Sequence, residues 1–430
     1  MTRSQTPARG RRRSRYFLSI SLAAATFIAH AQEMSHDGGD MMDMGAMSAL
    51  YGPYAMSREA SGTSWQPDSS AMGGVYRVQG QWQGMAHGQA DLMYDVQGGA
   101  RGAVQTFSTS WLMFMARRQL AHGALGLRFM LSGDPLMGRD GYPLLFQSGE
   151  TGNGVLPLID RQHPHDLLME AALSYSLNLS AHSSLFLYGG LPGEPALGPT
   201  AFMHRLSGMD DPEAPLAHHW LDSTHVAWGV ITTGYTWGNV KFEASAFNGR
   251  EPDQYHYNIQ TGALDSYAAR VTFNPTRDWS MQVSSGHLVA PEQLQPDINV
   301  QRTTASATYN APVTQSWQTT LAFGRNVPSA GAPSDGWLLE SDLRITPADT
   351  LFARLERVGK DELFLPGAAL YGRIFTINAL SLGYIRDFLR YGALNLGVGG
   401  LVSSYSYSAQ LNPSYGYRPT SFMVFVRARL

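Results

Sequence analysis

The stretch DSYAARVTFNPTRDWSMQVSSGHL, residues 265–288, carries the pattern that decides the fold. In residues 265–274, apolar side chains alternate with polar or small ones, and residues 279–288 repeat this period of two. Because successive side chains of a strand point to opposite faces, each segment is expected to be a strand with one apolar and one polar face. The short link at 275–278 predicts an antiparallel hairpin.

The same alternation recurs along the chain from residue 82. Charged residues occupy the polar face in strand after strand, as Lys241 and Glu243 do in one segment and Arg354 and Glu356 in another. A β-sandwich needs a second sheet to cover its apolar face, whereas a barrel in lipid has an apolar outside and a polar lumen. The expected strands are 82–97, 106–119, 123–132, 166–177, 183–190, 224–236, 239–248, 265–274, 279–288, 301–310, 317–326, 336–346, 350–358, 373–387, 391–402 and 419–430.

The links between these segments alternate in length. The longest are 133–165 and 191–223, and the short ones are 120–122, 178–182, 237–238, 275–278, 311–316, 347–349 and 388–390. Short periplasmic turns and longer outer loops are typical of bacterial outer-membrane barrels. We therefore expect an all-β fold, a transmembrane antiparallel β-barrel of about 16 strands (roughly 14–18) in the outer membrane of a Gram-negative bacterium, with both termini periplasmic.

The last twelve residues, 419–430, also alternate and end at Leu430. This ending resembles the signal read by the barrel-assembly machinery, which usually finishes in Phe or Trp. The expected partners are thus outer-membrane lipid, the barrel-assembly machinery, and a small solute or metal ion.

Composition agrees with such a barrel and excludes other classes. Charged residues make up 15% of the 430 residues, against about 25% in ordinary soluble domains. A net charge of −3 leaves no basic face for nucleic acid, and the lack of cysteine excludes thiolate metal sites and disulfides.

The N-terminus is expected to be a targeting segment. Six arginines between Arg3 and Arg15 precede a short apolar run at 16–28, and Ala29-His30-Ala31 offers small residues where a signal peptidase reads. The run is too short for a spanning helix, which needs about 20 residues. Residues 1–31 are therefore expected to be a cleaved signal peptide and residues 73–430 the barrel.

Residues 32–72 are predicted to be a disordered, flexible tail rich in Met, His and Asp. Thioether sulfur suits Cu(I), while imidazole and carboxylate suit Cu(II), so copper is the cofactor to consider. The alternative is a linker whose methionines have no ligand role. The candidate metal ligands of the tail are Met34, His36, Met41, Met42, Met44 and Met47.

The two longest links hold the densest polar chemistry. Three interpretations stay open: a hydrogen-bonded constriction of the porin type, a metal site, or catalysis by Ser207 or Ser223 with His225 and Asp222. Neither a GxSxG elbow in a strand–turn–helix setting nor an HExxH motif occurs. The candidate residues are Asp160, Arg161, His163, His165, Asp166, His204, His218, His219, Asp222 and His225.

Several segments carry a resemblance to known families. Residues 141–147 (GYPLLFQ), 149–151, 160–166, 191–199 and 218–225 are similar to those of a largely uncharacterised family of predicted outer-membrane β-barrel proteins. The resemblance covers residues 75–325 and implies a barrel without an assigned activity. The tail is similar in character to that of the copper-resistance outer-membrane protein B family, which implies a role with copper.

The expected function is that of a non-enzymatic outer-membrane barrel that handles a small solute or a soft metal ion. Copper tolerance is the leading specific hypothesis. The alternatives are a passive or selective porin whose long loops form the constriction, and an outer-membrane hydrolase.

Overall fold

The computed structural model describes residues 49–71, 73–311 and 316–430, which belong to one compact unit. The predicted signal peptide, 1–31, lies outside the described residues. So do all six candidate ligands of the tail: Met34, His36, Met41, Met42, Met44 and Met47.

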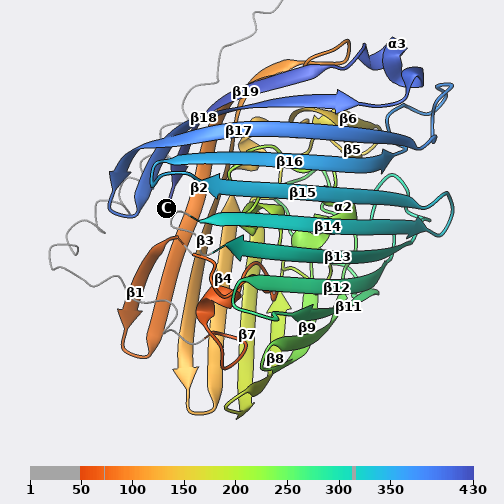
Figure 1. The fold of residues 1–430 in the computed structure, drawn as a ribbon. Helices are drawn as coiled ribbons and strands as arrows, with labels where there is room; N and C mark the ends of the chain where they lie inside the picture. The colour runs from red at the N-terminus through yellow and green to blue at the C-terminus, as the bar shows by residue number, and fades with distance from the viewer. Residues whose placement is uncertain (1–48, 72, 312–315) are drawn as a thin grey trace, which may run out of the picture. The chain divides into compact units, whose positions relative to one another are not determined.

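Sixteen antiparallel strands form a closed barrel, as the sequence predicted (Figure 1). Each strand pairs with the next in the chain, and β19 pairs with β2 from Phe422↔Val96 to Arg429↔Gln89, which closes the ring. The strands are β2 (Trp82–Val96), β3 (Val104–Leu120), β4 (Gly123–Ser132), β7 (Leu168–Ser180), β8 (Ser183–Gly190), β9 (Val230–Trp237), β10 (Val240–Phe247), β11 (Ser266–Phe273), β12 (Trp279–Leu288), β13 (Val300–Ala311), β14 (Trp317–Pro328), β15 (Ser334–Arg344), β16 (Asp349–Lys360), β17 (Phe375–Tyr391), β18 (Leu394–Ser406) and β19 (Thr420–Arg429).

The two faces of the wall differ as the alternation requires. Along β11, Tyr267, Val271 and Phe273 are exposed on the outside, whereas Arg270 on the inner face is 1% exposed. The outward apolar side chains match a hydrocarbon environment, and the inward charged ones are covered by other parts of the chain. Among the described residues, every helix is too short and too polar to cross a bilayer.

The connections divide the barrel into two ends. We call the end with the short links, such as 121–122 and 392–393, the turn end, and the opposite end the loop end. The loop end carries the long links: 133–167, 191–229, 248–265, 289–299, 361–374 and 407–419. The predicted alternation is confirmed, although β9 begins at Val230 rather than at 224 because residues 223–225 form the helical turn η5 (Ser223–His225).

Two long links fold into the barrel. Figure 1 shows β5 (Tyr142–Thr151), β6 (Pro157–Gln162) and α2 (His218–Leu221) inside the ring of strands. The pair β5–β6 is a separate two-stranded sheet. Trp220 of α2 packs on Gly324 and Gly336, and a Cβ at Gly336 would stand 2.9 Å from the Trp220 Cβ. Glycine is needed there because any side chain on the inner wall would collide with α2.

Residues 49–71 also pack inside the barrel, which corrects the prediction of a flexible segment that extends to residue 72. Tyr51 is fully buried, and its hydroxyl lies 3.1 Å from the Ser174 Oγ of β7. Lys241 of β10 donates to the carbonyl of Thr63. The segment has no regular period and forms no strand of the wall. Its tyrosine and backbone groups instead form hydrogen bonds with polar and basic side chains of the wall strands. Residues 49–71, β5, β6 and 192–229 are called the interior segments below.

One further strand was not predicted. β1 (Val75–Gln79) pairs with the beginning of β2 through a tight turn and lies outside the closed ring of sixteen.

Candidate functional site

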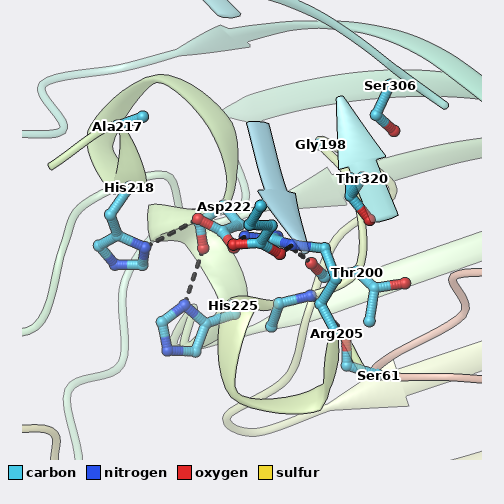
Figure 2. A network of polar contacts seen from close by, with 12 residues as sticks. Ser61, Gly198, Thr200, Arg205, Ala217, His218, Asp222, His225, Ser306 and Thr320 are labelled. Carbon is cyan, nitrogen blue, oxygen red and sulfur yellow. Dashed lines mark hydrogen bonds and ion pairs between the residues drawn. The ribbon is translucent and has the colours of Figure 1, made fainter. Parts of the chain in front are cut away.

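The geometry of the candidate site begins at α2, where His218 and Asp222 are four residues apart. The His218 Nδ1 lies 2.8 Å from the Asp222 Oδ1, and Arg205 donates to the Asp222 Oδ2 at 3.0 Å (Figure 2). Burial alone would raise the pKa of Asp222, but the hydrogen bond with His218 and the charge of Arg205 hold it below its usual value. Asp222 is therefore an ionised carboxylate in the barrel interior.

Arg205 also joins the interior to the barrel wall. Its guanidinium pairs with Glu340 of β15, which in turn lies 3.5 Å from Arg354 of β16. Arg354 completes the network with Asp211 at 3.1 Å, and all four side chains are at most 3% exposed. A buried charge needs each of its partners, so this network fixes the position of the 191–229 link.

A line of hydrogen bonds connects two further histidines. The His225 Nδ1 donates to the backbone oxygen of Asp222 at 2.7 Å, which leaves the His225 Nε2 as the acceptor for the His165 Nε2 at 3.1 Å. The His165 Nδ1 lies 2.8 Å from the Asp134 Oδ2. Burial, with His218 and His165 nearby, lowers the pKa of His225 well below its usual value, so this ring is a neutral acceptor.

Five of the six predicted histidines form one continuous group of rings. Centroid distances are 6.2 Å for His163–His165, 5.2 Å for His165–His225, 5.1 Å for His225–His218 and 5.7 Å for His218–His219. The His163 Nε2 lies 2.6 Å from the Glu150 Oε1. The group therefore unites both long links at the loop end.

The other predicted residues lie elsewhere. His204 faces His87 and Trp111, at ring distances of 5.7 Å and 4.7 Å, away from the five-histidine group. Asp160 pairs with Arg101 at 2.7 Å, and Arg161 donates to the carbonyl of Gly141 at 2.7 Å.

Asp166 forms hydrogen bonds that connect the 248–265 link to the rest of the loop end. It accepts hydrogen bonds from the Trp228 indole and pairs with His256, both at 2.9 Å. His256 belongs to the 248–265 link, so Asp166 ties this link to the start of β7. Together with Asp160 and Arg161, it stabilises loop conformation.

Neither Ser207 nor Ser223 forms the geometry for hydrolysis with His225. Ser207 Oγ is bonded to Thr320 and Glu340, and Ser223 Oγ accepts a hydrogen bond from Arg302. His225 is occupied by Asp222 and His165. A nucleophilic serine needs a hydrogen bond to its base, and neither serine has one here.

The sequence missed two residues that complete the loop-end group. Glu251 and Glu292 come from the 248–265 and 289–299 links, and both lie with His219 in one cluster of potential ligands. Each sits in a polar link whose spacing carries no signal, and only the closure of the barrel brings the links together.

Three cavities follow the interior of the barrel. The first has a volume of about 430 Å³, opens near residues 390–395 of the turn end, and is lined by Met85, His87, Trp111, Met113 and Met209 among others. The second, about 50 Å³, shares Trp111 and Met209 with the first and reaches His163 and His165. The third, about 10 Å³, lies beside Glu150, Glu251 and Glu292 at the loop end. The first two cavities therefore adjoin, and the third shares no lining residue with either of them.

Comparison with known proteins identifies the fold. No family model and no curated protein matches the chain, so both sequence resemblances stay predictions. Among solved structures, OmpF of Salmonella typhi, in complex with daunomycin, matches with a TM-score of 0.52 at 10% identity over 83% of this chain and 100% of that one. OprB of Pseudomonas putida, in a high-pH structure, matches with a TM-score of 0.50 at 9% identity over 81% and 94%. The fold is that of outer-membrane porin-like barrels.

Proposed function

We propose that the protein is a selective outer-membrane channel of the porin-like class, which passes a small solute past its own interior segments. We place the turn end of the barrel in the periplasm and the loop end on the outside of the cell, as in other outer-membrane barrels. Barrels of 16–18 strands commonly enclose an aqueous channel. Here the inward polar face is covered by residues 49–71 and by the two long links, which narrows the lumen.

The observation that carries the proposal is the row of cavities along the β2–β3 wall. The cavity of about 430 Å³ at the turn end and the one of about 50 Å³ beyond it meet at Trp111 and Met209. The Trp111 ring packs edge-on against both His87 and His204, so it fills the junction. A solute that crosses must pass this ring.

Exchange of Trp111 for alanine tests the route. In planar bilayers, Trp111→Ala is expected to raise the single-channel conductance several-fold over a low wild-type value, because the two cavities then join. Trp317→Ala is the matched control, since Trp317 lies on the outer face of β14 and is 43% exposed. An unchanged conductance in Trp111→Ala, with heat-modifiable migration showing a folded barrel, contradicts the route.

A second candidate function is a channel whose solute is a soft metal ion. The His87 Nε2 lies 3.3 Å from the Met113 Sδ, and Met56, Met85, Met115 and Met209 line the same cavity. Thioether and imidazole groups suit Cu(I). The candidate ligands of residues 32–47 precede this cavity in the chain and would serve the same ion.

Uptake into vesicles separates the two candidates. If Cu(I) is the solute, Met113→Leu lowers Cu(I) entry into proteoliposomes, whereas Met281→Leu on the outer face does not. Equal entry in both variants, with retained conductance for uncharged solutes, rejects the metal and leaves the channel.

A further inference from the structure

Five segments bring carboxylate and imidazole groups together at the loop end. Glu150 lies on β5, His163 follows β6, His219 is on α2, and Glu251 and Glu292 come from the links 248–265 and 289–299. One ligand atom from each of Glu150, His163 and His219 lies within 4.8 Å of the others, and the same holds for His219, Glu251 and Glu292. His219 belongs to both sets, so the two sets adjoin at this ring.

The carboxylates of this cluster contact histidine or hydroxyl groups, and no lysine or arginine pairs with them among the described residues. Both carboxylate oxygens of Glu251 are buried, and the hydrogen-bonding groups beside them are the Ser223 hydroxyl and the Glu150 carboxyl, neither of which carries a positive charge. The His219 side chain is 9% exposed, and its closest charged partner is Glu292, at 3.7 Å from Nδ1. Burial of an ionised carboxylate without a positive partner is unfavourable. Such a group indicates a missing positive partner.

The nearby basic residues are engaged elsewhere. The Arg302 guanidinium donates to Ser223 at 2.9 Å and to Asn326 at 3.0 Å, and the Lys360 Nζ donates to Gln147 at 2.8 Å. These two cations lower the repulsion among the carboxylates from a distance. They do not supply direct contacts to Glu251.

Burial and mutual repulsion disfavour ionised carboxylates in this cluster unless a positive charge compensates them. Burial and the charge of Glu292 raise the pKa values of Glu150 and Glu251 well above their usual range, so the carboxylates repel one another when ionised. Burial and neighbouring His165 lower the pKa of His163 to about 3. Burial with Lys360 nearby holds the pKa of His219 well below its usual value. Both imidazoles are therefore neutral near pH 7, which is the form that binds metals.

We propose that Glu150, His163, His219, Glu251 and Glu292 bind one divalent first-row transition ion, for which Zn²⁺ is the best match. Two imidazole nitrogens with carboxylate oxygens are a Zn²⁺-type donor set, whereas Ca²⁺ and Mg²⁺ take oxygen ligands. The ion neutralises the carboxylates and clamps the interior segments to two outer links. The site is independent of the solute that the channel passes.

Zn²⁺ binding to the full-length protein in detergent tests the site, with Ca²⁺ and Mg²⁺ titrated in parallel. We expect tight binding of one Zn²⁺ that weakens at least tenfold in Glu251→Gln and in His219→Ala, while Ca²⁺ and Mg²⁺ bind far more weakly. His182→Ala is the matched control, because His182 lies in the turn between β7 and β8 at the opposite end of the barrel. Any Zn²⁺ held by residues 32–47 would be equal in all these proteins.

Heat-modifiable migration of each variant establishes that the barrel is folded. X-ray absorption of the Zn²⁺-loaded wild type is expected to show two imidazoles among nitrogen and oxygen ligands. Equal Zn²⁺ binding by wild type, Glu251→Gln and His219→Ala overturns the proposal, and so does the absence of Zn²⁺ binding. In those cases the carboxyl groups share protons instead of a metal ion.

Discussion

Arg205 links a loop to the barrel wall at the level of single side chains. It contacts Asp222 at 3.0 Å and pairs with Glu340, and these side chains are at most 2% exposed. The exposed pair Arg325–Asp335, at 3.1 Å, has the same chemistry in water. Because removal of one partner leaves the other charge buried, the two pairs are expected to differ strongly in their effect on stability.

The first prediction compares these pairs. Arg205→Ala is expected to lower the free energy of unfolding by about 3–5 kcal/mol, since Asp222 and Glu340 lose a buried partner. Arg325→Ala is expected to change it by at most about 1 kcal/mol. Urea titration of the protein in lipid vesicles measures both, and similar losses would show that the buried network does not hold the link.

Glu194 gives a second prediction, on pH. This carboxyl is 6% exposed, and burial, together with Glu170 and Asp222, raises its pKa from 4.5 to about 8 despite the nearby Arg270 and a hydrogen bond to Ser61. Between these two pH values the folded state binds a proton that the unfolded state has lost. The stabilising proton is fully present below pH 4.5, and stability falls as the pH rises towards 8.

Glu194→Gln removes this dependence because glutamine stays neutral. The melting temperature of the wild type in detergent is expected to fall between pH 5 and pH 8 by more than that of Glu194→Gln, by an amount equivalent to a few kcal/mol. If the melting temperatures of the two proteins changed equally with pH, Glu194 would not be the source of the pH dependence.

Single residues also show what the sequence can predict. The alternation places Arg270 and Glu243 on the inner face, and they pair there at 2.9 Å. The alternation cannot predict that Glu251 lies close to His219. Glu251 belongs to a link without a period, and its position depends on how the ring of strands closes.

At the scale of elements, the strands and the interior segments differ in how far the sequence determines them. Each wall strand has a period of two and a short turn at one end, so its bounds follow from local pattern. The apolar run at 142–146 has no such period, because β5 is covered on all sides inside the barrel. Residues 49–71 also lack a period, so the sequence predicts a flexible tail there, whereas their order comes from contacts with β7, β10 and the turn after β9.

The third prediction concerns residues 49–71. Their deletion is expected to raise the single-channel conductance, because the segment borders the cavity of about 430 Å³ with Leu50, Met56 and Glu59. The barrel itself is expected to assemble, since the sixteen wall strands pair without the segment. A variant that is heat-modifiable and conducts like the wild type would show that residues 49–71 do not obstruct the channel.

At the scale of the whole molecule, the outer face of the wall exposes large apolar side chains on strand after strand. Val283 in the middle of β12 is 59% exposed, and Leu321, Leu355 and Val424 on other strands are exposed as well. This surface is stable only against lipid or detergent. The predicted outer-membrane barrel accounts for it, and fractionation with the outer membrane is the expected behaviour.

The fourth prediction tests that lipid-facing surface. Val283→Arg is expected to lower the free energy of unfolding in vesicles by about 2–4 kcal/mol, the cost of an arginine near the bilayer midplane. Tyr257→Arg, at an exposed position in the 248–265 link, is expected to have little effect. Equal effects would mean that the middle of β12 does not face lipid.

The single-channel conductance of the wild-type protein in planar bilayers tests the central claim most directly. The interior segments leave cavities of about 430, 50 and 10 Å³ in place of an open lumen. We therefore expect discrete channel events with a conductance far below that of an open porin of sixteen strands measured in the same bilayer. A conductance equal to that of the open porin, or a folded barrel that never conducts, would contradict the account.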